Sequence, residues 1–216
     1  MKKFKYFFLF IITNFVIYLH AAEEKRALIY FHGGGGIFGK IDQEKDTQFI
    51  KQLESKYNPI IQVDYNLFWT RNHSIINQHK INEIISTLPK DQEFDVLGVS
   101  AGAYIFMNSI QNLERLPKKF IGISPMLTSE GTFITQTIEA LNKLTDPPSK
   151  NCNNANQAIQ NIDFPLIIFH GENDPIIKKE SLEQFCKDKN CKFNSIKNGK
   201  HRLLNHTEII EMIKNY

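Results

Sequence analysis

The chain has 216 residues, of which 42% are hydrophobic and 23% are charged. This length suits one domain with its own core, and the composition excludes a collagen, a coiled coil, a disordered chain and a dense disulfide scaffold. The net charge of +3 comes from three lysines within residues 1–22. The remaining 23 basic and 23 acidic residues balance, so no basic stripe is left for nucleic acid.

Residues 1–22 have the order of a secretory signal: three lysines, an apolar run from Tyr6 to Leu19, and the small pair Ala21 and Ala22. The apolar run is shorter than the roughly 20 residues that a membrane-spanning helix needs. We therefore expect an exported protein, periplasmic or extracellular in a bacterium. Residues 1–22 are expected to be a signal peptide or, alternatively, an N-terminal anchor, and membrane contact is expected only if they are retained.

Residues 23–216 alternate short apolar runs with amphipathic segments. Such runs are typical of strands buried on both faces, and the alternation predicts one α/β domain with a parallel sheet and helices on both faces. The six predicted strands are 27–31, 59–63, 94–99, 120–123, 164–169 and 192–196.

Residues 128–162, between the fourth and fifth predicted strands, interrupt this alternation of strands and helices. They contain Pro147-Pro148 and many asparagines, and they are too long for a simple crossover. We expect a small flap or cap insertion there.

Three cysteines occur, and no pair has the CxxC spacing of a structural zinc site. We therefore expect no metal. Cys186 and Cys191 are close enough to pair in an oxidising compartment, which would leave Cys152 odd. The sequence leaves this connectivity open.

The segment Gly98-Val99-Ser100-Ala101-Gly102 lies between the third predicted strand and a helical pattern. A serine at a sharp strand-to-helix turn needs strained backbone angles, and glycines two residues away on either side let the turn close. The following helix directs its positive end toward the hydroxyl group. This context predicts that Ser100 is a nucleophile.

A glycine run follows the first predicted strand and fits three kinds of site. Gly34 to Gly39 matches the dinucleotide pattern GxGxxG, with Asp64 in place as a ribose-binding acid. A phosphate-binding loop is also matched up to Lys40, but Ile41 stands where a Ser or Thr would hold Mg²⁺. Free glycine amides also suit an oxyanion hole. The run alone does not decide between dinucleotide and oxyanion, although export argues against a nicotinamide cofactor.

Two further segments follow the last predicted strands. Asp174 lies in a turn after the fifth strand, where an acid can orient an imidazole, and Glu172 competes for the same task. His170 is expected to satisfy a local hydrogen bond before this turn. His201 follows the sixth strand, and His206 is the weaker candidate for the imidazole.

All four segments fall at the carboxyl ends of parallel strands, where ligands of open α/β sheets bind. A strand order of 2-1-3-4-5-6 would place the glycine run beside the serine turn. We therefore expect acyl transfer, with His201 as the base for Ser100 and Asp174 as the partner of the imidazole. The amides of Gly34 and Ala101 would hold the oxyanion.

With these segments the chain resembles the α/β-hydrolase family, most closely its esterase and lipase branch. The resemblance rests on HGGGG at 32–36, VDYN at 63–66, GVSAG at 98–102, HGENDP at 170–175 and GKH at 199–201. It implies a three-layer α/β-hydrolase fold over residues 23–216, trimmed to six strands because the two usual first strands are missing. It also implies Ser100, Asp174 and His201 as the triad, with Gly34, Gly35 and Ala101 as oxyanion donors.

The expected substrate is a small or soluble carboxylic ester, and no cofactor is expected. Candidates for the wall of the acyl pocket are aromatic, namely Phe38, Phe68, Trp69 and Tyr104. The alternatives are a peptidase, thioesterase or acyltransferase with the same triad, a dinucleotide-binding oxidoreductase, and a non-catalytic binding protein. The sequence leaves the oligomeric state open.

Overall fold

The computed structural model describes residues 25–33, 43–63, 73–127, 159 and 162–216. The predicted signal segment 1–22 and nearly all of the predicted insertion 128–162 lie outside the described residues. Within the part that is described, every helix is too short or too polar to cross a membrane.

In the described part of the chain, six parallel strands form one sheet in the order β2-β1-β3-β4-β5-β6, as the sequence predicts. The order in which strands are added to the sheet reverses after β2, so β1 and β3 lie side by side, with Phe31 of β1 opposite Gly98 of β3. The strands are β1 (Ala27–Phe31), β2 (Ile60–Gln62), β3 (Phe94–Val99), β4 (Phe120–Ile123), β5 (Leu166–Gly171) and β6 (Lys192–Ile196).

The predicted position of β5 is wrong by two residues at each end. The strand was expected over 164–169 but continues through His170 and Gly171, which pair with β6. A histidine is polar enough to signal the end of a strand, yet both residues are buried here by the neighbouring strand and loops. His170 is therefore a core residue and does not belong to the following turn.

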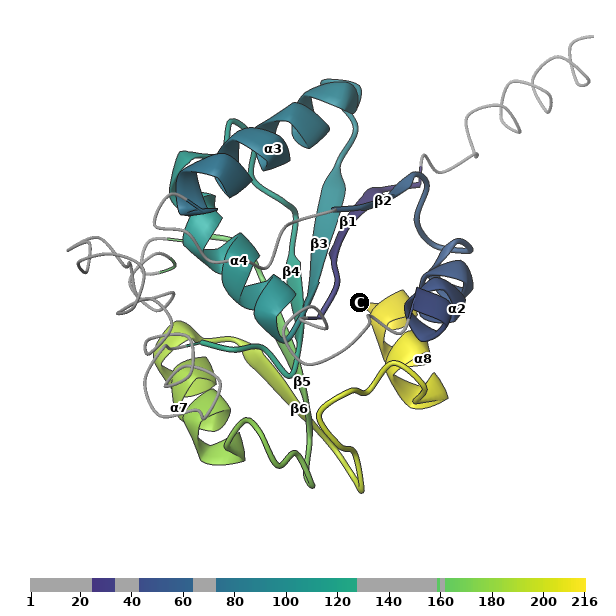
Figure 1. Cartoon of the computed structure of the whole chain (residues 1–216), viewed down its shortest axis with the longest axis vertical. Helices are drawn as coiled ribbons and strands as arrows, with labels where there is room; N and C mark the ends of the chain where they lie inside the picture. The colour runs from purple at the N-terminus through teal and green to yellow at the C-terminus, as the bar shows by residue number, and fades with distance from the viewer. Residues whose placement is uncertain (1–24, 34–42, 64–72, 128–158, 160–161) are drawn as a thin grey trace, which may run out of the picture.

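Helices cover both faces of the sheet (Figure 1), α3, α4 and α7 on one face and α2 and α8 on the other. Alternate residues of β1 serve the two layers, because successive side chains of a strand point to opposite faces. Ala27, Ile29 and Phe31 belong to one apolar cluster and Leu28 and Tyr30 to the other. The α-helices of the described residues are α2 (Gln43–Leu53), α3 (His73–Thr87), α4 (Ala101–Ser109), α7 (Lys179–Lys189) and α8 (Thr207–Asn215).

A disulfide joins Cys186 near the end of α7 to Cys191 just before β6. It closes the tight connection in which Asn190 adopts the left-handed conformation, with φ of 51°. Of the pairings that the sequence leaves open, this is the one the structure contains.

A buried ionic cluster lies at the amino-terminal edge of the sheet, around Asp95 of β3. The Tyr57 hydroxyl donates to Asp95 Oδ2 at 2.9 Å, and the Lys119 ammonium lies 3.3 Å from the same oxygen. Arg26 approaches the other carboxylate oxygen at 3.6 Å. Burial and the charge of Asp95 raise the pKa of Tyr57, while burial and the charge of Lys119 lower the pKa of Lys56 to about 8.

Candidate active site

Ser100 occupies the sharp turn between β3 and α4, with φ of 48° and ψ of −114°. Few residues other than glycine adopt a positive φ, so the surroundings must hold this strained backbone in place. The Ser100 amide donates to the carbonyl of Ile123 at 2.9 Å, which ties the turn to the end of β4. The hydroxyl group is thereby held at the carboxyl edge of the sheet.

The two glycines that flank Ser100 allow this turn to close. A Cβ atom on Gly98 would lie 2.6 Å from the Ala103 Cα atom. A Cβ atom on Gly102 would lie 2.4 Å from the carbonyl oxygen of His32 and 2.5 Å from that of Phe31. Real Cβ atoms do not come so close to backbone, so the serine turn and the end of β1 can touch only because these positions lack side chains.

Asp174 lies in the turn after β5, and its side chain is fully buried. Its Oδ1 atom accepts the amides of Ile176 at 2.8 Å and Ile177 at 3.1 Å. Burial by itself would raise the pKa of Asp174. The hydrogen bond and charge of His201, together with the two amides, outweigh burial and hold this pKa below its ordinary value. The carboxyl group is therefore ionised at neutral pH.

The loop that carries His201 is packed directly against the loop that carries Asp174. A Cβ atom on Gly171 would lie 2.4 Å from the backbone of Gly199, so the two segments of the chain meet at glycines. The Asn173 amide also donates to the Gly199 carbonyl at 2.8 Å. This contact fixes the acid and the imidazole relative to each other.

The structure brings Ser100, Asp174 and His201 together, although 101 residues separate the serine from the histidine. The Ser100 hydroxyl lies 2.8 Å from His201 Nε2, and His201 Nδ1 lies 2.8 Å from Asp174 Oδ2. With the proton on Nδ1, the imidazole donates to the carboxylate and accepts from the hydroxyl. This is the arrangement in which a serine can lose its proton to a base as it attacks a carbonyl.

The competing candidates lie elsewhere. Glu172 is exposed and accepts a bond from the Ser195 hydroxyl at 3.3 Å, so Asp174 is the acid beside the imidazole. His206 stands just before the first turn of α8.

The candidate oxyanion donors are only partly described. Gly34 and Gly35 lie outside the described residues, but Gly33 packs against the end of β3, since a Cβ atom there would meet Val99 at 3.3 Å. Ala101 is the first residue of α4, so its amide has no acceptor within the helix. The glycine run thus starts beside the serine turn.

The candidate pocket residues Phe38, Phe68 and Trp69 also lie outside the described residues. Tyr104 lies one turn into α4, half-buried against the apolar cluster under that helix. Its amide donates to the Ser100 carbonyl at 3.3 Å.

Sequence reasoning misjudged His170. Its Nδ1 atom lies 3.6 Å from Asp174 Oδ2, and among the described residues it has no hydrogen-bond partner, contrary to the predicted local bond. Burial lowers the pKa of His170, an effect that the charge of Asp174 only partly offsets. Two imidazoles therefore face one carboxylate oxygen. The only hint in the sequence that His170 lies near Asp174 is that both belong to the HGENDP segment.

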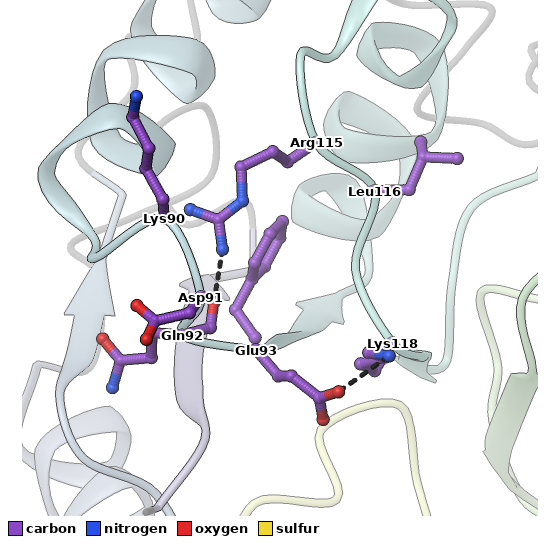
Figure 2. Close-up of a pocket in the computed structure, with 8 residues that line it drawn as sticks. Lys90, Asp91, Gln92, Glu93, Arg115, Leu116 and Lys118 are labelled. Carbon is purple, nitrogen blue, oxygen red and sulfur yellow. Dashed lines mark hydrogen bonds and ion pairs between the residues drawn. The ribbon is translucent and has the colours of Figure 1, made fainter.

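A hollow of about 350 Å³ lies at the opposite, amino-terminal edge, next to Phe94 at the start of β3 (Figure 2). Three of its charged side chains, Glu93, Arg115 and Lys118, have partners within the molecule. Lys118 pairs with Glu93 at 2.7 Å, and Arg115 donates to the Pro89 carbonyl at 3.1 Å and to that of Gln92. This hollow is separate from the serine site.

No protein-family model matches the chain, and no curated protein matches its sequence. Solved structures do match. An esterase from Thermogutta terrifontis with bound propionate has a TM-score of 0.62 at 18% identity, over 90% of this chain and 83% of that one. A puromycin-hydrolysing peptidase from Mycobacterium tuberculosis has a TM-score of 0.64 at 13% identity, over 89% of this chain and 33% of that one.

A protein from Bacillus cereus has a TM-score of 0.60 at 16% identity, and the likeness covers 88% of this chain. The chain spans only 58% of the length of that protein. At these identities the likeness concerns the fold, and together with the strand order it confirms the predicted α/β-hydrolase fold with six parallel strands.

Proposed function

We propose that this chain is an exported serine hydrolase that cleaves carboxylic esters with small or soluble acyl groups. The observation that carries the proposal is the chain of contacts from Ser100 through His201 to Asp174, each 2.8 Å long. The hydroxyl lies in a strained strand-to-helix turn at the carboxyl edge of the sheet. Esterases among the structures of similar fold add support.

In this mechanism His201 Nε2 takes the proton of Ser100 as the oxygen attacks the ester carbonyl. Asp174 holds the imidazole in the required tautomer and stabilises the imidazolium that forms. The Ala101 amide, with Gly34 and Gly35, holds the tetrahedral oxyanion, and losing one such donor typically costs about 3 kcal/mol. His201 then protonates the leaving alcohol, and water repeats the sequence on the acyl-enzyme.

Export is supported by the signal-like order of residues 1–22 and by the disulfide between Cys186 and Cys191. Disulfides persist in oxidising compartments such as the bacterial periplasm and the medium. The proposed location is therefore periplasmic or extracellular.

The first test is labelling with a fluorophosphonate, which reacts with activated serines. We expect the wild-type chain to be labelled and Ser100→Ala to be unlabelled, since the alanine removes the hydroxyl oxygen that His201 Nε2 contacts. Ser124→Ala is the matched control, because Ser124 also has a positive φ, of 41°, after a neighbouring strand. Labelling that survives in Ser100→Ala would overturn the proposal.

A peptidase with the same three residues is the second candidate, favoured by the peptidase among the structures of similar fold. A panel of p-nitrophenyl esters of graded chain length, run beside a panel of aminoacyl amides, separates the two. The proposal expects turnover of short esters at rates well above those of the amides, and the reverse order would favour the peptidase.

A further inference from the structure

His201 lies on a long connection between β6 and α8 that contains neither helix nor strand. One side of this connection is fixed by the contact of Gly199 with the Asp174 loop. That contact comes two residues before the imidazole. A second anchor after His201 is needed to hold the ring against both Ser100 and Asp174.

Arg202, the residue directly after His201, supplies such an anchor. Its Nη2 atom lies 2.7 Å from Asp46 Oδ2, and Asp46 is in the first turn of α2. The other carboxylate oxygen accepts a hydrogen bond from the Tyr30 hydroxyl of β1. The ion pair thus joins the loop that carries His201 to α2 and β1, whereas the Gly199 contact joins it to the loop that carries Asp174.

The Asp46 carboxylate is almost completely buried, with 2% of the side chain exposed. A buried carboxylate is costly unless cations and hydrogen-bond donors compensate it, so the geometry of this pair is strongly determined. Leu203 and Leu204, which follow, are buried in the same apolar cluster as Phe49 of α2. The backbone on the carboxyl side of His201 is therefore held by both charge and packing.

We propose that Arg202, through its ion pair with Asp46, is a positioning residue for His201. His201 extends toward Ser100 while Arg202 extends to α2, so the peptide between them is held from two directions. Displacements of about 1 Å at a catalytic group can cost roughly a hundredfold in rate. The consequence for turnover rests on the function proposed above, whereas the consequence for the imidazole does not.

The test compares Arg202→Met, which keeps the aliphatic stem, with Arg202→Lys, which keeps a positive charge that can reach Asp46. We measure kcat and KM on p-nitrophenyl acetate, thermal stability, and the far-downfield proton resonance of His201 Nδ1 bonded to Asp174. In Arg202→Met, kcat should fall about tenfold or more with KM within about twofold, and the resonance should broaden by exchange with water. Arg202→Lys should recover most of the wild-type kcat and most of the sharpness of the His201 resonance.

Arg26→Met is the matched control. Arg26 has the same side-chain exposure as Arg202, 41%, and it also faces a buried carboxylate, Asp95, but at the opposite edge of the sheet. This variant should lose stability while keeping kcat and the resonance. Loss of catalysis that merely follows stability would appear in both methionine variants and would overturn the proposal.

A folded Arg202→Met that keeps wild-type kcat and the sharp resonance would also overturn it. Should Arg202→Met fail to fold, Asp46→Asn removes the same pair and leaves an acceptor for Tyr30. A wild-type chain without esterase activity would defeat the proposed function, and the resonance would then decide the positioning role without it.

Discussion

At the scale of single residues, the unusual feature is that two histidines face one carboxylate. His201 hydrogen-bonds to Asp174, while His170 stands 3.6 Å away, buried and neutral because burial lowers its pKa. A protonated His170 would place a second cation beside the imidazolium that the proposed mechanism forms on His201. Keeping His170 neutral therefore keeps the charge of Asp174 available to His201.

This burial predicts how stability depends on pH. The pKa of His170 is lower in the folded protein than the ordinary value of 6.5, so the unfolded chain binds the proton more readily. The contribution to stability is complete above about pH 6.5 and is lost as the pH falls below it. In His170→Asn, the free energy of unfolding from urea titrations should therefore fall less steeply between about pH 7 and pH 5.

His79→Asn serves as the control for this slope, because the His79 side chain is 80% exposed. It shows how far replacing an exposed imidazole by asparagine changes the slope by itself. Equal slopes for His170→Asn and the wild type would contradict the assignment of a buried neutral imidazole.

Sequence patterns could predict that the three residues of the candidate site meet, because each one follows a recognisable strand. Ser100, Asp174 and His201 come after apolar runs, and parallel strands bring such positions to one edge. Arg202 and Asp46 could not be paired in this way, because 156 residues separate them and an isolated charge carries no pattern. Their contact depends on how α8 and α2 share one face of the sheet.

At the scale of elements, four strands have the predicted bounds and β2 is slightly shorter than predicted. The shift of β5 arises because pairing with β6 continues to Gly171 opposite Ile196, which composition cannot reveal. The apolar signal of 192–196 is the weakest of the six runs, since β6 is an edge strand with only Ile196 fully buried. Edge strands carry less of the apolar signal that sequence analysis uses.

The disulfide before β6 should stabilise the weak edge of the sheet. The bond from Cys186 to Cys191 closes a short loop, and a loop of this size is expected to contribute about 2 kcal/mol. The double variant C186A/C191A should lose about that much free energy of unfolding in urea titrations and keep fluorophosphonate labelling at Ser100.

Reductant provides the internal control for that variant. It should lower the stability of the wild-type chain to that of C186A/C191A and leave the variant itself unchanged. A wild-type chain that is insensitive to reductant under unfolding conditions would contradict the contribution assigned to this bond.

At the scale of the whole molecule, the two edges of the sheet have different roles. The carboxyl edge carries Ser100, Asp174 and His201, whereas the amino edge holds the buried charges around Asp95. The motifs in the sequence predict that these three residues meet at the carboxyl edge. The charges at the amino edge were not predicted, because Asp95 and Lys119 lie within or beside apolar runs in which a charge looks like an interruption.

The ionic cluster should therefore contribute to the stability of the fold and have no effect on the reactivity of Ser100. In Asp95→Asn, the Lys119 ammonium, 5% exposed, would lose its buried counter-charge. Breaking a buried pair from one side typically costs about 3–5 kcal/mol, so we expect a loss of that order in the free energy of unfolding. The fluorophosphonate labelling rate of the folded variant should equal that of the wild type.

The order of the strands also has a consequence for biosynthesis. The proposed nucleophile, Ser100, follows β3, while its proposed base, His201, follows β6 at the far rim of the sheet, 101 residues later. A chain made or translocated amino end first therefore presents its hydroxyl long before the imidazole arrives. If the proposed function holds, the nascent polypeptide lacks a base for its hydroxyl group until β6 has paired with β5 and brought His201 to the carboxyl edge of the sheet.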